Sequence, residues 1–160
     1  MSSAALFRRS FRDACGLFAT GVAVVTTRAA NGQAHGITVN SFCSLSLDPP
    51  LVMVAIAKEC TYLNHFESCA FFAVNILRED QFDLSHRFAH LPDNRFQGIP
   101  YRDTASGSPW IDHALALLDC KTTQILDMGD HRLLIGEVLE VAVSEGRPLI
   151  FFRSGYTELS

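Results

Sequence analysis

Two long extended segments in the last third of the chain, residues 114–127 and 132–143, are joined only by the turn Met128-Gly129-Asp130-His131. A second turn at 144–147 leads into a short apolar strand at 148–152. Earlier apolar or β-branched runs predict further strands at 22–27, 33–40, 51–57 and 71–77. About six closely spaced strands, with helices only at the ends and in insertions, predict a mainly β fold built on a closed antiparallel barrel that leaves no bare edge.

Length and composition favour one compact unit. The chain has 160 residues, of which 48% are hydrophobic, and no internal repeat or linker interrupts it. A chain of this size can bury roughly 68–70% of its unfolded surface, so we expect a single domain over residues 1–160. The net charge is −4 and no basic cluster is present, which argues against a nucleic-acid partner.

The chain shows no targeting or membrane signal. Arg8 and Arg9 interrupt the first apolar run, which is too short for a signal peptide. No segment reaches the roughly 20 apolar residues of a membrane span, so we expect no membrane partner. The five cysteines are odd in number and never form a C-x-x-C pair, which indicates reduced thiols in a cytoplasmic protein.

Helices are expected at three places. Residues 4–18 place apolar side chains at helical spacing, which predicts an amphipathic helix covering one end of the core. Thr61 could cap a short helix that runs through Glu67. Residues 78–90 read as a third helix.

Three other segments carry signals of their own. Asn31-Gly32 is a strong hairpin signal between the strands at 22–27 and 33–40. The run at 51–57 is continuously apolar and is expected to be buried on both faces. Residues 91–110 contain three prolines and should form an irregular excursion, whose length suggests a function.

Short polar side chains are concentrated in residues 36–51, GITVNSFCSLSLDPPL. Ser, Thr and Asn supply both donors and acceptors, and they are small enough to let a flat heterocycle approach the backbone. The stretch could therefore form a lip that binds the polar edge of a ligand. Its composition also suits a loop that satisfies its own backbone groups.

Most named catalytic motifs are absent. The chain lacks G-x-G-x-x-G, G-x-x-x-x-G-K-[ST], G-x-S-x-G and H-E-x-x-H, so a nicotinamide cofactor would have to bind without a Rossmann unit. His86 and His90 are four residues apart on an expected helix, but no third ligand accompanies them and no metal site is predicted. Cys60 lies near Lys58 without a His or acid placed beside it, so a nucleophilic role is not expected.

Six short motifs in order resemble the flavin reductase-like domain, the family of short NAD(P)H:flavin oxidoreductases that supply reduced flavin to two-component monooxygenases. The resemblance covers nearly the whole chain, from about residue 11 to 156. The motifs are FATGVAVVTT at 18–27, GITVNSF at 36–42, SLSLDPP at 44–50, GDH at 129–131, IGEV at 135–138 and GY at 155–156.

The resemblance implies an FMN-binding split barrel, a six-stranded antiparallel Greek-key barrel with flanking helices. Such proteins are usually homodimers with flavin near the subunit boundary. Hydride would pass from a reduced nicotinamide to the flavin, so the cofactors do the bond-making and the protein supplies proximity and electrostatics.

The resemblance also implies a set of binding residues. Gly36 would leave room beside the flavin, Lys58 and Arg87 would supply positive charge, and His131 would be the catalytic residue that orients the nicotinamide or relays a proton. Cys60 stands where the family more usually has Ser or Thr, which removes one hydroxyl donor. The full implied set is Gly36, Thr38, Val39, Asn40, Ser41, Ser44, Ala57, Lys58, Cys60, Thr61, Arg87, Phe88, Ala89, His131 and Tyr156.

The sequence therefore predicts an NAD(P)H-dependent flavin reductase that transfers hydride to FMN or FAD and serves a partner monooxygenase. A non-catalytic FMN-binding or electron-transfer module on the same barrel is the alternative. An oxidase of the pyridoxine-phosphate type is disfavoured, because no clustered basic site is present for a second phosphate. FMN or FAD, and NADH or NADPH, stay open at this stage; the adenylate end of FAD would lie in irregular segments such as 91–110.

Overall fold

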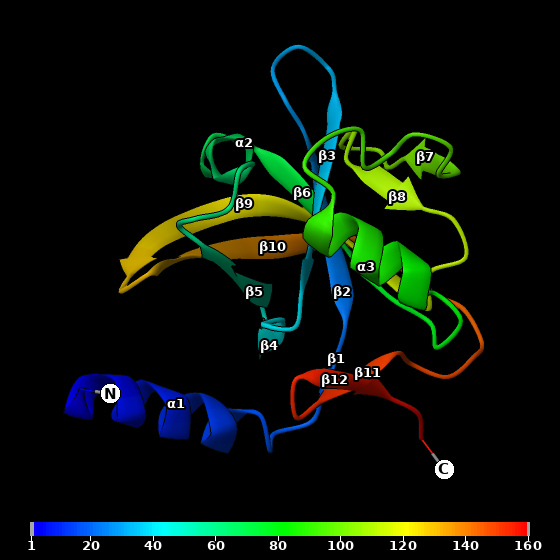
Figure 1. Ribbon diagram of the computed structural model, residues 1–160. Coiled ribbons are helices and arrows are strands. Elements are labelled where there is room, and N and C mark those ends of the chain that lie inside the picture. The colour runs from blue at the N-terminus through cyan, green and yellow to red at the C-terminus, as the bar shows by residue number, and fades with distance from the viewer. Residues whose placement is uncertain (1, 160) are drawn as a thin grey trace.

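The computed structural model describes residues 2–159, which form a β-rich body and three helices (Figure 1). The helices are α1 (Ser3–Cys15), α2 (Leu63–Glu67) and α3 (Phe82–His90). The main sheet contains β2 (Ala23–Arg28), β3 (Ala34–Val39), β4 (Cys43–Leu47), β5 (Pro50–Ala57), β6 (Phe71–Ile76), β9 (Ala116–Met128) and β10 (His131–Val143). Two small sheets contain β1 (Thr20–Gly21), β11 (Ile150–Phe152) and β12 (Gly155–Thr157), and β7 (Tyr101–Asp103) and β8 (Pro109–Ile111).

The main sheet is antiparallel throughout, with the strand order β3-β2-β6-β9-β10-β5-β4. β9 and β10 form the long hairpin expected from the last third of the chain. Gly32 has a φ of 83°, as the expected Asn-Gly turn between β2 and β3 requires. The prediction of a mainly β fold is confirmed, although this sheet has seven strands rather than six.

The sheet does not close on itself by hydrogen bonding. β3 and β4 are its end strands, and β3 approaches β5 without pairing with it. The expectation of a barrel with no bare edge is therefore wrong. The short β4, whose side chains are largely exposed, extends the far end of the sheet instead of joining β3. One side of the barrel is consequently open between β3 and β5.

Helix α1 stands apart from the barrel (Figure 1) and has no buried residue. The side chains of Phe7 and Phe11 are 73% and 63% exposed. In the single chain this helix does not cover an end of the core, so that prediction is wrong. The predicted amphipathic helix itself is present. Ser2 caps its first turn through a side-chain contact with the Ala5 amide.

Three other local predictions need correction. β5 alternates buried and half-buried residues, because only one of its faces is turned to the barrel core, so it is not buried on both faces. Helix α2 begins at Leu63 with Tyr62 at the N-cap, and Thr61 does not cap it. The segment 91–110 is not wholly irregular, since β7 and part of β8 pair within it.

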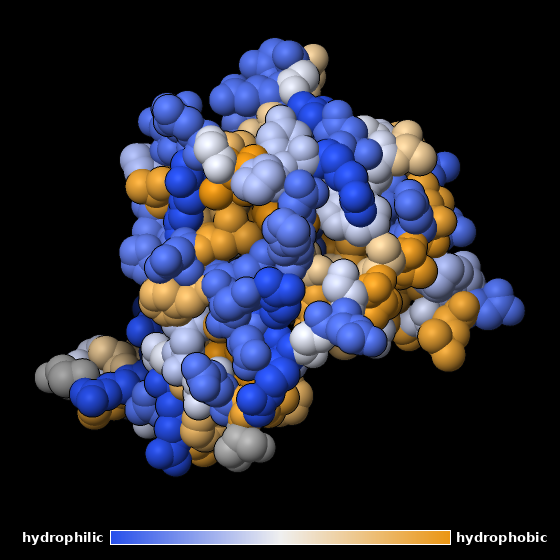
Figure 2. Space-filling model, turned by 90° about the vertical axis from the view of Figure 1, so that its right-hand side faces the viewer, coloured by the Kyte–Doolittle hydropathy of each residue, from blue (hydrophilic) through white to orange (hydrophobic). Residues whose placement is uncertain are grey.

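Two clusters form the core. One fills the barrel and includes Val25, Val54, Phe66 and Phe72. The other lies between the barrel and α3 and includes Phe88 and Leu149. Figure 2 shows that hydrophobic patches also reach the surface on the face at the right of Figure 1. Within residues 2–159, no helix has the length and apolar character needed to cross a bilayer.

Candidate functional site

A cavity of about 400 Å³ lies at the open side of the barrel, and we call it the β3–β5 pocket. The last residues of β3 and those after it form one wall, and the end of β5 with the turn toward α2 forms the other. Residues of α3 and the first residue of β10 complete it. Its lining contains ten of the residues implied by the family resemblance: Thr38, Val39, Asn40, Ser41, Ala57, Cys60, Thr61, Phe88, Ala89 and His131.

Two hydroxyls of the polar lip are already bonded inside the protein. Thr38 donates to the carbonyl of Ser85 at 2.7 Å. The Ser41 hydroxyl donates to the carbonyl of Ala55 at 2.8 Å and accepts from the amide of the same residue at 3.0 Å. These contacts join β3 and its following loop to α3 and β5, so they shape the pocket. The exposed Asn40 and Thr61 carry the polar side chains that a ligand can reach.

His131 begins β10 directly opposite Ala57 in the β5–β10 ladder, which places it in the β3–β5 pocket. Its Nδ1 lies 2.6 Å from a carboxylate oxygen of Asp130. The same contact, together with the charge of a protonated His131, lowers the pKa of Asp130. With Nδ1 held by the carboxylate, Nε2 is the ring nitrogen available to a ligand.

Arg95 is the main cation that the sequence reasoning missed. It lines the β3–β5 pocket, and its side chain donates to the carbonyls of Leu91 at 2.6 Å and Gly36 at 2.9 Å. Arg87, which was expected to meet the flavin, points instead to the carbonyls of residues 94, 95 and 97. Arg87 therefore holds the loop that carries Arg95.

Three other predicted residues lie outside the lining of the β3–β5 pocket. Lys58 pairs with Asp127 at 2.8 Å, a carboxylate that Arg132 also contacts. Ser44 is an exposed residue of the end strand β4. Tyr156 lines a neighbouring, more apolar cavity of about 410 Å³ that shares Thr38 and Asn40 with the β3–β5 pocket.

Gly36 was expected to leave space for the ligand, but that space is occupied. A Cβ built on this residue would lie 2.6 Å from Cε1 of Phe88. The glycine thus lets the ring of α3 pack against β3, and it borders a different cavity beside the β2–β3 hairpin. Among residues 2–159, no group of three or more His, Cys, Asp and Glu side chains is arranged to hold a metal ion.

The family model of the flavin reductase like domain matches residues 15–160 of this sequence. The chain belongs to this family. The family resemblance predicted from the sequence is thereby confirmed. Solved structures of flavin reductases that match this chain confirm the split-barrel fold.

Two similar proteins illustrate the flavin reductase family. The reductase component of the flavin-dependent trigonelline monooxygenase of Acinetobacter baylyi is 43% identical over 92% of this chain and 48% of its own length. The FMN reductase (NADH) SmoA of Agrobacterium fabrum is 40% identical over 95% of this chain and 86% of its own length. The chain therefore spans about half the length of the first relative and most of the second.

A solved structure has the same fold. The NADH:FAD oxidoreductase SgcE6 of Streptomyces globisporus, in complex with NAD and FAD fragments, superposes with a TM-score of 0.90 at 30% identity. The match covers 96% of this chain and 93% of that chain.

The β3–β5 pocket suits a flat ring with polar edges. Its volume of about 400 Å³ falls within the usual range for small-molecule sites, roughly 300–1,000 Å³. Val39, Ile56 and Phe88 supply buried apolar surface, and Asn40 and Thr61 supply hydrogen-bonding groups at the rim. Arg95 adds positive charge for an anionic group.

Proposed function

We propose that this chain is an NAD(P)H-dependent flavin reductase that transfers hydride from a reduced nicotinamide to FMN or FAD. The reduced flavin would be supplied to a partner monooxygenase. The observation that carries the proposal is the β3–β5 pocket, in which apolar walls, Arg95 and His131 meet at the open side of a flavin reductase barrel. The printed names of its relatives, a monooxygenase reductase component and an NADH-dependent FMN reductase, support this reaction.

A bound flavin would supply the hydride-accepting N5 atom, which no side chain of the protein replaces. The chain's own residues bind and orient the reactants. The apolar walls at Val39 and Phe88 exclude water from the reacting faces, and Asn40 and Thr61 offer hydrogen bonds at the rim. Nε2 of His131 contacts the nicotinamide or holds a proton, while Asp130 fixes the ring through Nδ1.

We also propose a homodimer in the cytoplasm. Helix α1 exposes apolar side chains that no part of the described chain covers, which supports a second copy as its partner. All five cysteines are free, which supports a reducing compartment.

The test is oxidation of NADH and NADPH by the purified protein, each with FMN and with FAD, followed by nicotinamide absorbance. We expect oxidation that depends on added flavin. No oxidation with any of the four combinations would refute the reductase. Stoichiometric yellow flavin that neither nucleotide bleaches under anaerobic conditions would instead indicate a flavin-binding or electron-transfer module.

A further inference from the structure

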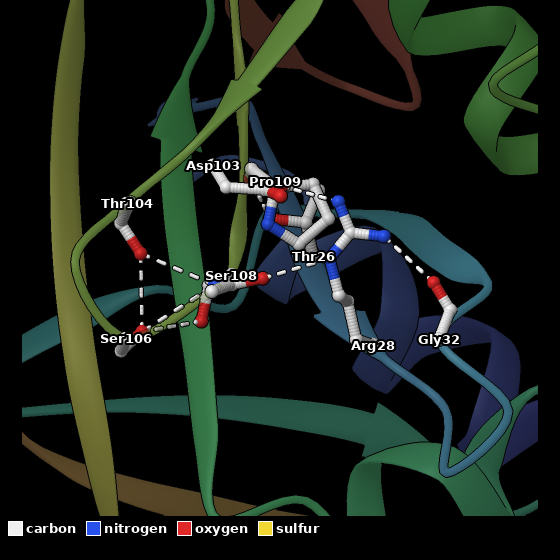
Figure 3. Close-up of polar contacts among 9 residues, drawn as sticks. Thr26, Arg28, Gly32, Asp103, Thr104, Ser106, Ser108 and Pro109 are labelled. Atoms are coloured by element: carbon white, nitrogen blue, oxygen red, sulfur yellow. Dashed lines mark hydrogen bonds and ion pairs between the residues drawn. The ribbon is translucent and has the colours of Figure 1, made fainter.

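Two polar clusters outside the β3–β5 pocket differ in whether their hydrogen-bonding groups are already used. In the first, Arg28 pairs with Asp103 and donates to the carbonyls of Gly32 and Gly107 (Figure 3). These contacts tie the β2–β3 turn to the β7–β8 hairpin. The guanidinium of Arg28 is therefore committed to holding the fold together and is not available to a ligand.

The second cluster is the histidine pair of α3, His86 and His90. Both side chains are exposed and stand four residues apart on one helix, so they project from the same face. Their ring centroids are 4.4 Å apart. Among residues 2–159, His131 is the only histidine whose side chain forms a hydrogen bond or an ion pair. The ring nitrogens of His86 and His90 are thus unused within the described chain.

The angle between these two rings suits a shared ligand. An imidazole binds a metal through a nitrogen lone pair that lies in the plane of the ring. The stacked rings of His35 and His65 are 4.1 Å apart and inclined by only 11°, so their lone pairs stay in nearly parallel planes and do not meet. The rings of His86 and His90 are inclined by 50°, so their lone pairs can converge. Metal–imidazole bonds of about 2.0–2.1 Å then allow one ion to reach both rings.

The charges around the histidine pair favour a cation. His90 is the last residue of α3, and the C-terminal end of a helix carries partial negative charge. Asp83, in the first turn, stands three residues before His86 and adds a carboxylate to the same side of the helix. Arg87 lies in the same turn as His90, but its guanidinium is turned to carbonyls of the loop at 94–97.

We propose that His86 and His90 form a binding site for a divalent transition-metal ion of the class that imidazole prefers, such as Ni²⁺, Cu²⁺ or Zn²⁺. Water completes the coordination, because within residues 2–159 no third His, Cys, Asp or Glu side chain is arranged to join the pair. The inference does not depend on the proposed reductase activity.

The site has a structural consequence for the neighbouring cavities. Helix α3 forms part of the β3–β5 pocket, and His90 lines the apolar cavity of about 410 Å³ beside it. An ion held by two side chains four residues apart links successive turns of α3. Metal binding therefore stabilises the helix that borders both cavities.

Calorimetric titration of the untagged protein with Ni²⁺ tests the inference. Ni²⁺ is the chosen probe because it suits imidazole, whereas the thiolates of the free cysteines select softer ions. His86→Ala and His90→Ala each remove one ligand from an exposed helical position, where alanine favours the helix. His113→Asn is the matched control, because it removes an exposed histidine outside α3 and Asn tolerates the φ of 63° at that position.

The wild-type protein should bind one Ni²⁺, and each α3 variant should raise the Kd at least about tenfold. The His113→Asn variant should bind as the wild type does. Saturating Ni²⁺ should raise the Tm of the wild type and of the control, because the ion binds the folded helix, and should not raise that of the two α3 variants. Circular dichroism without metal shows that each variant is folded.

Three results would overturn the inference. The wild type fails to bind Ni²⁺, or both α3 variants bind it as tightly as the wild type. In the third, only one of the two variants loses binding, which would mean that a single histidine and not the pair is the ligand. An equal rise of Tm in the wild type and both α3 variants would likewise place the ion elsewhere on the protein.

Discussion

Gly36 in β3 packs directly against Phe88 in α3, and a Cβ on Gly36 would approach Cε1 of that ring to 2.6 Å. Phe88 is fully buried and lines the β3–β5 pocket, so its ring has little room to move. Gly36→Ala should lower the free energy of unfolding by about 1–3 kcal/mol and weaken flavin binding. Urea unfolding and flavin fluorescence measure the two effects.

Gly21→Ala is the matched control for that substitution. A Cβ on Gly21 in β1 meets no atom within 4 Å. Its unfolding free energy should stay within about 0.5 kcal/mol of wild type. Equal stabilities of the two variants would show that the Phe88 ring can make room for a Cβ at position 36.

His131→Ala should raise the KM for the nicotinamide nucleotide about tenfold or more, because it removes a hydrogen bond to a polar or charged group. The KM for flavin should change much less. Asp130→Asn should act in the same direction but more weakly, since its amide oxygen still accepts from Nδ1. Steady-state kinetics over both substrates checks this, with the exposed His113→Ala as control. Equal changes in both KM values would remove the assignment of His131 to the nicotinamide.

His35 should make the protein less stable in mild acid. Burial, followed by the charges of His65 and Arg95, lowers the pKa of His35. As the pH falls below about 6.5, the unfolded chain takes up a proton that the folded protein resists, so stability decreases. Above that pH the group is neutral in both states and contributes no slope.

Thermal unfolding between neutral pH and about pH 5.5 measures this dependence. His35→Asn should reduce the fall in Tm across that range, and the exposed His113→Asn should leave it unchanged. If the Tm of His35→Asn falls with pH as steeply as that of the wild type, protonation of His35 is not the cause of the fall.

Helix α1 should hold the proposed homodimer together. Phe7 and Phe11 are its most exposed aromatic side chains, so the double substitution Phe7→Gln with Phe11→Gln should shift the protein toward monomer. Arg9→Gln with Arg12→Gln alters the other side of the helix and should leave the dimer intact. Sedimentation velocity distinguishes the two, and a wild-type monomer would refute the dimer.

The barrel was largely predictable because its strands carry local signals. The Asn31-Gly32 turn and the long runs on either side of Gly129 set the β2–β3 and β9–β10 pairs. The burial of α1 was not predictable, because the same apolar stripe suits a core or a partner chain. The one-sided burial of β5 likewise depends on which strands flank it.

The binding site was predicted less completely. The motif at 36–42 supplies one wall of the β3–β5 pocket, as the sequence suggested. The hydrogen bonds of Thr38 to Ser85 and of Ser41 to Ala55 were not predictable, because these partners are distant in sequence. Arg95 lies in a segment without periodicity, so nothing local marked it. Arg87 was expected to supply positive charge because the family resemblance places it beside the flavin, but its side chain donates to the carbonyls of residues 94, 95 and 97.

The open side of the barrel has a thermodynamic consequence. β3 and β5 are neighbours in space but are separated by β2, β6, β9 and β10 along the hydrogen-bonded ladder. A bound ligand that contacts both strands therefore links two strands that are far apart in the strand order of one sheet. Its binding should slow amide hydrogen exchange around the whole ladder and not only beside the ligand.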